Sequence, residues 1–266
     1  MTGVTEPGAG PAGRVLVVVP TYDERDSLPR ALAALRRHVP AADVLVVDDA
    51  SPDGTGELAE RIAAADAADR GRTAIHVLHR AGKQGLGTAY VAGFRWALER
   101  GYDAVVEMDA DGSHRAEDLP RLLERVPEAE LVIGSRWVRG GRVVNWPVHR
   151  QLLSRGANTY AWLAMGLPVR DATAGFRVYR AATLGRLALG EVASHGYCFQ
   201  IDMAWRVLTA GGRVVEVPIT FVERAEGRSK MSRSIVVEAL VRVTVWGAQE
   251  RGRQLRDLVR RLGRRA

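Results

Sequence analysis

Short apolar runs alternate with amphipathic stretches through the first half of the chain. Val15–Val19 is typical of a strand buried on both faces of a parallel sheet, and Pro20 follows it directly. In the next stretch leucines recur at helical spacing from Leu28 to Leu35, with Ser27 as the predicted N-cap. The pattern therefore predicts a strand followed by a helix.

The same cycle repeats as far as residue 133. Further strands are predicted at Val44–Val47, Ala74–Leu78, Ala104–Met108 and Leu131–Ile133, and further helices at Glu57–Ala65, Thr88–Arg100 and Glu117–Val126. Alternation of this kind predicts an α/β domain with a Rossmann-like, doubly wound and mostly parallel sheet. In such sheets ligands bind outside the carboxyl ends of the strands.

Acidic residues follow three of the predicted strands. The sequences are Pro20-Thr21-Tyr22-Asp23-Glu24, Asp48-Asp49-Ala50-Ser51-Pro52-Asp53-Gly54-Thr55 and Asp109-Ala110-Asp111. Any one of them alone is an ordinary turn sequence. Three at one sheet edge favour a cation site, because crowded carboxylates repel one another and hard oxygen ligands suit Mg²⁺ or Mn²⁺.

These three motifs resemble the GT-A glycosyltransferases of family 2. Four later segments are similar to the dolichol-phosphate and polyprenol-phosphate mannose synthases: Gly134-Ser135-Arg136, the stretch from Arg150 to Asn158, Asp171-x-Thr173-x-Gly175-Phe176-Arg177, and Arg224-x-x-Gly227-x-Ser229-Lys230. The resemblance extends from Arg14 to Trp246, which is nearly the whole chain.

The resemblance implies a reaction. A metal-dependent enzyme of this kind moves mannose from GDP-mannose to a polyprenyl (dolichyl-type) monophosphate, with inversion, and releases GDP. The implied cofactor is Mg²⁺ or Mn²⁺, which stabilises the departing diphosphate as a Lewis acid. UDP-glucose as the donor to the same class of acceptor remains the alternative.

The resemblance also implies site residues, by position in this sequence. The catalytic residues are Asp109, Asp111 and Arg136, and the metal ligands are Asp109, Asp111 and Ser113, the last at a position where several relatives carry glutamine. The nucleotide-sugar residues are Pro20, Tyr22, Glu24, Val47, Asp49, Asp109, Ala110, Asp111, Arg136, Arg224 and Lys230, and the acceptor-phosphate residues are Arg136, Arg150 and Ser154. The guanidinium fork of arginine suits a bidentate contact with phosphate.

The net charge of +7 is concentrated at the C-terminal end. Residues 251–266 hold seven arginines and Asp257, a local charge of +6, which leaves +1 for the rest of the chain. We expect a disordered stretch at 1–13, a GT-A catalytic domain at 14–228, an amphipathic interface helix at 229–250 and a basic tail at 251–266. A basic tail after a nearly neutral domain indicates an anionic surface as partner.

Two apolar segments indicate contact with a membrane surface. Residues 145–167 and 230–249 mix aromatic and aliphatic side chains with arginines, a pattern that suits peripheral helices in the membrane interface. No stretch is long and apolar enough to span a bilayer, and the single cysteine, Cys198, fits a reducing compartment. We expect a peripheral protein at the cytoplasmic face of the plasma membrane, and an additional membrane-protein anchor is left open.

Two other classes of protein share single features with this sequence. A nucleic-acid-binding protein would account for the arginine tail, but the nearly neutral body argues against it, and we expect no nucleic-acid partner. A nicotinamide dehydrogenase would share the fold class, but no Gly-x-Gly-x-x-Gly follows Val19. The stretch Gly82-Lys83-Gln84-Gly85-Leu86-Gly87 lacks the P-loop spacing, so it is predicted to be a strand-to-helix turn.

Overall fold

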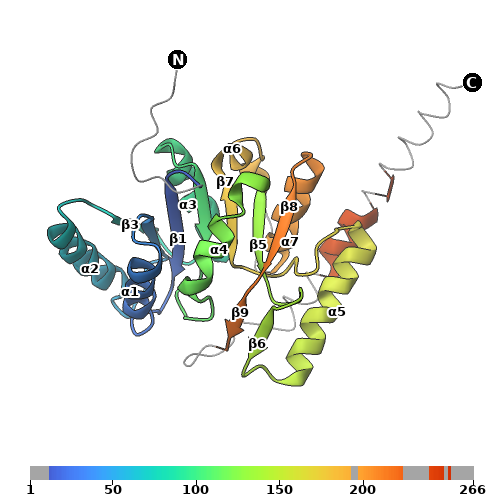
Figure 1. Cartoon of the computed structure of the whole chain (residues 1–266), viewed down its shortest axis with the longest axis horizontal. Helices are drawn as coiled ribbons and strands as arrows, with labels where there is room; N and C mark the ends of the chain where they lie inside the picture. The colour runs from blue at the N-terminus through green and yellow to red at the C-terminus, as the bar shows by residue number, and fades with distance from the viewer. Residues whose placement is uncertain (1–11, 193–196, 224–239, 249–250, 253–266) are drawn as a thin grey trace, which may run out of the picture.

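The computed structural model describes residues 12–192, 197–223, 240–248 and 251–252. A seven-stranded sheet lies at its centre, with helices on both faces (Figure 1). The strands are β1 (Val15–Thr21), β2 (Asp43–Asp48), β3 (Ile75–His79), β4 (Ala104–Glu107), β5 (Leu131–Ser135), β6 (Arg142–Val144), β7 (Arg177–Arg180), β8 (Val214–Pro218) and β9 (Thr220–Val222). The helices are α1 (Leu28–His38), α2 (Thr55–Arg70), α3 (Leu86–Glu99), α4 (Leu119–Leu123), α5 (Val148–Met165), α6 (Ala181–Leu184) and α7 (Tyr197–Thr209), and residues 240–248 are also helical.

The predicted doubly wound, mostly parallel sheet is confirmed. Its strand order is β3-β2-β1-β4-β7-β5-β8, and all neighbours are parallel except that β7 runs antiparallel to both β4 and β5. A second sheet, in which β6 and β9 pair in parallel, extends from the end where β5 and β8 finish and lies beside α5 (Figure 1). The carboxyl ends of β1, β2 and β4 therefore lie at one edge, as the alternation predicted.

Side chains alternate along the strands between two hydrophobic cores. Leu16 and Val18 of β1 pack with α3, α5 and α7 on one face of the sheet. Val17 and Val19 pack with α1 and α4 on the other face. Because both faces of the central strands are buried, these strands are continuous apolar runs in the sequence, which is why the simple pattern located them.

Two sequence predictions are corrected by the model. The predicted helix at Glu117–Val126 is wrong as one element, because it consists of a 3₁₀ turn (Ala116–Asp118), the five-residue α4 and a second 3₁₀ turn (Val126–Glu128). Pro120 lies in the first turn of α4 and Pro127 in the second 3₁₀ turn; since proline has no N–H to donate, it favours helix starts over helix interiors. Ser27 precedes α1 as expected but does not cap it, because its hydroxyl donates instead to the Glu24 carboxylate at 2.6 Å.

The two predicted interface segments are partly described. α5 covers residues 148–165, and its Ala161 and Met165 join the core together with Val243 of the 240–248 helix. Their outer faces expose large apolar side chains: Val148, Leu152, Leu153, Trp162, Leu163, Leu240, Val241 and Val245. Of the helices that the model describes, none is long and apolar enough to cross a bilayer. Of the predicted disordered start, residues 1–11 lie outside the described residues, whereas Ala12 is ordered and packs in the core, so the prediction is wrong there. Most of residues 229–250 and most of the basic tail also lie outside the described residues.

Candidate functional site

The loop after β2 is built around the buried carboxylate of Asp48. Its Oδ1 accepts hydrogen bonds from Thr21 Oγ1 at 2.9 Å and from Ser51 Oγ at 2.6 Å, so this one side chain joins the ends of β1 and β2. Ala50 has a left-handed backbone with φ of 55°. Left-handed backbone in a non-glycine residue is costly and persists where surrounding contacts fix it. The loop is thus rigidly shaped at the edge where ligands bind in such sheets.

Asp49 points to a basic partner from the next loop. Its Oδ1 lies 2.8 Å from Arg80 Nη1, and its Oδ2 accepts the backbone N–H of Gln84 at 3.4 Å. Burial raises the pKa of Asp49, although the charge of Arg80 opposes that rise. The glycine-rich stretch lies between β3 and α3, as predicted, and its Lys83 Nζ lies 3.8 Å from the ring centroid of Tyr22. Asp49 and Tyr22, two of the expected nucleotide residues, therefore both border this turn.

Pro20, Glu24 and Val47 differ in what they offer a ligand. Pro20 pairs in register with Val47 across β1 and β2, and the Val47 side chain is wholly buried in the core. A ligand at this edge could reach Val47 only through its backbone. Glu24 is half-buried, with its carboxylate already held by Ser27.

The acidic turn after β4 is held by two side chains that the sequence reading did not single out. Tyr90, from α3, donates its hydroxyl to Asp109 Oδ1 at 2.9 Å. Burial, followed by the charge of Asp109, raises the pKa of Tyr90 well above its usual value, so the hydroxyl stays protonated. The backbone N–H of Asp109 donates to His114 Nδ1 at 3.0 Å, which assigns His114 to the neutral tautomer protonated on Nε2.

Asp111 and Ser113 complete this turn. Ser113 donates its backbone N–H to Asp111 Oδ1 at 3.0 Å, while its own carbonyl accepts the N–H of Val222 at 3.2 Å. Ala110, between the two aspartates, has its side chain in the core, so it too can meet a ligand only through its backbone. The acidic turn is therefore tied to both α3 and β9.

The acidic turn fits a divalent cation. Asp109 and Asp111 are both half-buried at the carboxyl end of β4, with hard carboxylate oxygens at the edge of the sheet. Among the described residues no cluster of three or more His, Cys, Asp or Glu side chains could hold a metal alone. A sparse protein ligand set suits Mg²⁺ or Mn²⁺, which completes its shell with water and phosphate oxygens.

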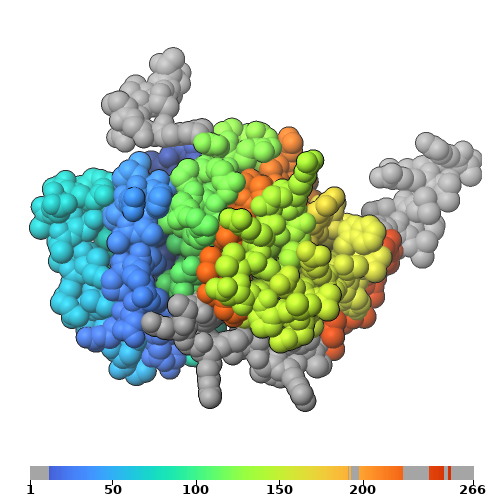
Figure 2. Space-filling model, turned by 60° about the horizontal axis from the view of Figure 1, so that its bottom comes forward, coloured from blue at the N-terminus to red at the C-terminus, as the bar shows by residue number. Residues whose placement is uncertain are grey.

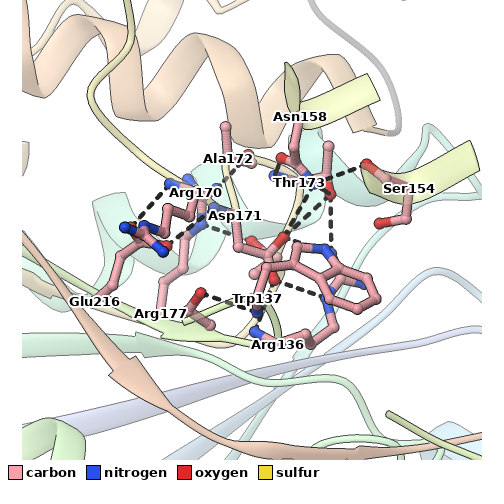
Figure 3. A network of polar contacts seen from close by, with 12 residues as sticks. Arg136, Trp137, Ser154, Asn158, Arg170, Asp171, Ala172, Thr173, Arg177 and Glu216 are labelled. Carbon is pink, nitrogen blue, oxygen red and sulfur yellow. Dashed lines mark hydrogen bonds and ion pairs between the residues drawn. The ribbon is translucent and has the colours of Figure 1, made fainter. Parts of the chain in front are cut away.

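Arg136 is buried in a bidentate pair with Asp171. Its Nε and Nη2 donate to the two carboxylate oxygens at 2.8 and 2.6 Å, and Nη2 also donates to Thr173 Oγ1 at 2.9 Å (Figure 3). The guanidinium carbon lies 5.3 Å from the ring centroid of Trp146. The fork that the sequence reading assigned to phosphate is therefore directed at a carboxylate of the protein.

Arg150 and Ser154 lie one turn apart on α5, and Arg150 approaches the same indole ring as Arg136. The guanidinium carbon of Arg150 is 4.5 Å from the Trp146 ring centroid, and its Nη1 pairs with Glu223. Ser154 Oγ and the Trp146 indole nitrogen are both buried, with no hydrogen-bond partner among the described residues. Buried donors without acceptors beside two guanidinium groups suit an anion.

Phe221 of β9 lies between His114, which follows the acidic turn, and the rings and guanidinium group around Arg136. Its ring centroid lies 5.6 Å from that of His114 and 5.3 Å from that of Trp146, and the Arg136 guanidinium carbon is 5.5 Å from it. The acidic turn and Arg136 are thus linked through two rings in contact, those of His114 and Phe221. Figure 2, which looks toward this end of the molecule, shows α5 in yellow-green on the opposite side from the blue and cyan N-terminal elements.

A groove of about 610 Å³ runs along α5 beside this cluster. It is lined by Trp137, Arg155, Asn158, Thr159, Trp162, Pro168, Val169 and Arg170. Asn158 also donates to the carbonyl of Ser154 at 2.9 Å, so one end of the groove borders the arginine cluster.

The sequence reading located some parts of the site and missed others. Asp109, Asp111, Arg136, Arg150 and Ser154 lie in two neighbouring clusters, whereas Arg224 and Lys230 lie outside the described residues. It missed the side chains that hold these clusters in place: Tyr90, His114, Trp146, Asn158 and Phe221. Two of them had a signal in the sequence: His114 directly follows the acidic turn, and Asn158 ends one of the segments that carry the resemblance.

Comparisons with known proteins identify the family of the chain. The family model described as "Glycosyl transferase family 2" matches residues 16–187. An undecaprenyl-phosphate mannosyltransferase of Micrococcus luteus is 57% identical over 243 residues, which cover 91% of this chain and 98% of that protein. A polyprenol monophosphomannose synthase of Mycolicibacterium smegmatis is 51% identical, with 97% of this chain and 98% of that protein covered.

Solved structures with similar folds are more distant in sequence. A glucosyl-3-phosphoglycerate synthase from Mycobacterium tuberculosis superposes with a TM-score of 0.62 at 17% identity, covering 90% of this chain and 85% of that one. A mannosyltransferase from Pyrobaculum calidifontis, in complex with GDP-Man and Mn²⁺, gives a TM-score of 0.53 at 22% identity, covering 85% and 62%. At these identities the likeness concerns the fold.

Proposed function

Because the chain belongs to glycosyl transferase family 2, we propose that it transfers mannose from GDP-mannose to a polyprenyl monophosphate. The chain is a glycosyltransferase with the GT-A fold. The choice of mannose and of a polyprenyl phosphate follows the names of two relatives that match nearly its whole length.

The observation that carries the proposal is that two unlike clusters are linked through the adjoining rings of His114 and Phe221. One cluster offers carboxylates, at Asp109 and Asp111, and the other offers guanidinium groups, at Arg136 and Arg150. A metal-bound nucleoside diphosphate suits the first cluster and a phosphate monoester suits the second. The sugar to be transferred would lie between them.

The donor occupies the edge formed by β1, β2 and β4. Tyr22 packs beside the base, Glu24 and Asp49 accept its polar hydrogens or those of the ribose, and the backbones of Pro20, Val47 and Ala110 border the nucleotide. Asp109 and Asp111 would hold Mg²⁺ or Mn²⁺, with Ser113 or water at the remaining protein position. The bound cation stabilises the negative charge that gathers on the leaving diphosphate. Arg224 and Lys230 are assigned to the same diphosphate.

The reaction is a single displacement at C1 of mannose. An oxygen of the acceptor phosphate forms the new bond to C1, the bond from C1 to the diphosphate oxygen breaks, and GDP departs with that electron pair. Attack from the face opposite the diphosphate inverts the configuration at C1. A phosphate monoester loses its second proton at about pH 6, so the acceptor needs positioning more than a general base.

The acceptor phosphate lies against Arg136, Arg150 and Ser154, and the groove along α5 gives its prenyl chain a path. Trp137, Trp162 and Val169 line that groove, and the outer face of α5 continues as exposed apolar side chains. Amphipathic helices of this kind lie in the bilayer interface. The enzyme would therefore work as a peripheral protein on the cytoplasmic face of the plasma membrane.

Donor choice tests the proposal. The full chain is incubated with undecaprenyl phosphate, Mg²⁺ or Mn²⁺, and either GDP-mannose or UDP-glucose labelled in the sugar, and label is counted in the organic phase. We expect lipid-bound label from GDP-mannose, released as mannose by mild acid. Label from UDP-glucose alone would overturn the donor assignment, and no lipid product from either donor would overturn the function.

A further inference from the structure

Asp171 is a buried carboxylate between α5 and β7, with no exposed surface. We propose that Asp171 is a positioning residue for the acceptor: it fixes the Arg136 guanidinium so that only its Nη1 edge is offered to the acceptor phosphate. This inference rests on the proposed function, since it concerns how that acceptor is held.

Arg136 donates four N–H groups to the loop that carries Asp171 and Thr173, and three of them go to the Asp171 carboxylate. The backbone N–H and Nε of Arg136 both donate to Oδ2 at 2.8 Å, and Nη2 donates to Oδ1 at 2.6 Å. The remaining hydrogen of Nη2 is directed at Thr173 Oγ1 at 2.9 Å. Backbone and side chain of one residue are therefore clamped by one carboxylate, as Figure 3 shows.

Nη1 is the guanidinium nitrogen that remains. Among the described residues no acceptor lies within hydrogen-bonding distance of Nη1. The guanidinium carbon of Arg136 lies 5.3, 5.5 and 5.7 Å from the ring centroids of Trp146, Phe221 and Trp137. Three aromatic rings at these distances leave the planar guanidinium group of Arg136 little room to rotate. Arg136 therefore meets an acceptor end-on, through one nitrogen, rather than through the bidentate fork that the sequence suggested.

The clamp is itself supported from two other elements. Glu216 of β8 accepts the backbone N–H groups of Arg170 and Asp171 at 2.8 and 2.9 Å. Asn158 of α5 contacts the network through the Thr173 hydroxyl at 3.2 Å, and it also donates to the carbonyl of Ser154. Asp171 therefore fixes Arg136 and ties it to the helix that carries Arg150 and Ser154.

The two arginines of the cluster are held in different ways. Arg136 and Asp171 are 5% and 0% exposed as side chains, whereas Arg150 and Glu223 are 17% and 27% exposed. Arg150 pairs with Glu223 through one nitrogen, Nη1. Because this pair is partly exposed, Arg150 can replace the Glu223 carboxylate with the phosphate of an acceptor. Within the arginine cluster, Arg136 is therefore held in one position, whereas Arg150 can change its partner.

Binding of farnesyl phosphate, a short and soluble acceptor analogue, tests the assignment in the full chain. Asp171→Asn keeps the shape but removes the charge and one acceptor, so we expect at least about tenfold weaker binding, the usual cost of one hydrogen bond to a charged group. The dissociation constant of GDP with Mn²⁺ should stay unchanged. In turnover assays the loss should fall on the KM for the acceptor.

Asp202→Asn is the matched control. Asp202 is also buried and pairs with Arg206 on α7 at 2.8 Å, without contact to Arg136, so this variant should leave farnesyl phosphate binding unchanged. If Asp171→Asn does not fold, Thr173→Val removes one acceptor from Arg136 Nη2 and should weaken the same binding to a smaller extent. Arg136→Lys should cost less in the Asp171→Asn background than in the wild type.

The outcomes separate the two proposals. If folded Asp171→Asn and Thr173→Val both bind farnesyl phosphate as tightly as the wild type, the role of Asp171 is overturned but the proposed acceptor is not. An equal loss in Asp202→Asn, or a parallel loss of GDP binding, would also overturn it, because either would mark a general structural effect. A wild-type chain that binds no prenyl phosphate would overturn the proposed acceptor and the role of Asp171 together.

Discussion

Asp109 receives a hydrogen bond from a tyrosine that is wholly buried beneath it. Tyr90→Phe keeps the ring in the core but removes the hydroxyl that donates to Asp109 Oδ1 at 2.9 Å. A hydrogen bond to a charged group contributes about 1.5–3 kcal/mol, so we expect roughly tenfold or more weaker binding of GDP-mannose with Mn²⁺. Titration calorimetry measures this directly.

Tyr102→Phe is the control for that change. Tyr102 donates its hydroxyl to Asp43 Oδ2 at 2.8 Å, which is also a tyrosine–aspartate bond but lies at the opposite edge of the sheet, where β2 begins. This variant should lose stability without losing donor affinity. Equal donor affinity in Tyr90→Phe and the wild type would show that the bond to Asp109 has no part in donor binding.

Glu107 makes the stability of the fold depend on pH. Burial raises the pKa of Glu107 from 4.5 to about 7, against the opposing charge of Arg177, its register partner on β7. Between these two values the folded chain holds a proton that the unfolded chain has lost. The free energy of unfolding should therefore fall as pH rises through this window, by up to about 3 kcal/mol at 1.36 kcal/mol for each pKa unit.

Urea denaturation at pH 4.5 and pH 8, in chelator and without divalent cation, measures this. Glu107→Gln cannot titrate, so the stability of the wild type relative to this variant should decrease between the two pH values. A difference that is the same at both pH values would show that folding does not shift the pKa of Glu107.

At the residue scale the sequence indicated candidate ligands but not the side chains that hold them in place. Asp109 and Asp111 stand out because two carboxylates follow a buried strand with one residue between them. Asp171 contacts Arg136 from 35 positions away, and Tyr90 contacts Asp109 from 19, so neither partnership leaves a local pattern. Such contacts exist only once the sheet has brought β4, β5 and β7 together.

Among the secondary elements, α3 packs unusually close to the sheet. A Cβ added at Gly93 would lie 2.4 Å from Val18 Cγ1, so alanine cannot enter without moving the helix or the strand. Gly93→Ala should lower the free energy of unfolding by about 1–3 kcal/mol, the usual cost of overpacking. Since α3 carries Tyr90, donor affinity should fall as well.

Gly156→Ala is the matched control on α5. Its added Cβ would meet nothing within 4 Å, and alanine is favoured over glycine in a helix by about 1 kcal/mol. This variant should be slightly more stable than the wild type by chemical denaturation. If Gly93→Ala were as stable as Gly156→Ala relative to the wild type, α3 could not pack as closely on β1 as described.

Element types were predictable where the apolar pattern was strong. The first five strands and the first three helices appear within a few residues of their predicted positions. The strands β1, β2, β4 and β5 are continuous apolar runs because they are buried on both faces, and α1 and α3 each bury one apolar side. Strands β6 and β9, three residues each and only partly buried, have no such pattern. The antiparallel β7 was also missed, since its direction depends on the long α5 excursion before it.

For the molecule as a whole, the basic tail is predicted to dock the enzyme on anionic membrane. Leu255, Leu258, Val259 and Leu262 recur at helical spacing among arginines, although this segment lies outside the described residues. Each basic residue near an anionic leaflet contributes about 1 kcal/mol. Cosedimentation should therefore show that a chain ending at Glu250 binds anionic vesicles more weakly than the full chain does. Added salt should also weaken the binding of the full chain to these vesicles.

Neutral vesicles and a soluble acceptor are the controls for truncation. Binding to neutral vesicles should change little, and turnover of farnesyl phosphate should persist, because the tail is assigned no part in the chemistry. Unchanged binding to anionic vesicles, or abolished turnover of the soluble acceptor, would argue against a docking tail.

The central claim is a metal-dependent mannosyl transfer to polyprenyl phosphate at the acidic turn after β4. The most direct measurement follows GDP release and mannosyl-lipid formation together, for the wild type, Asp111→Ala and the control Asp66→Ala, which removes the distant partner of Arg70 on α2. We predict one mannosyl lipid for each GDP, unchanged in Asp66→Ala and reduced at least about 100-fold in Asp111→Ala, since metal stabilisation of the leaving group contributes several kcal/mol. GDP release without mannosyl lipid, or near wild-type turnover by Asp111→Ala at low Mn²⁺, would contradict it.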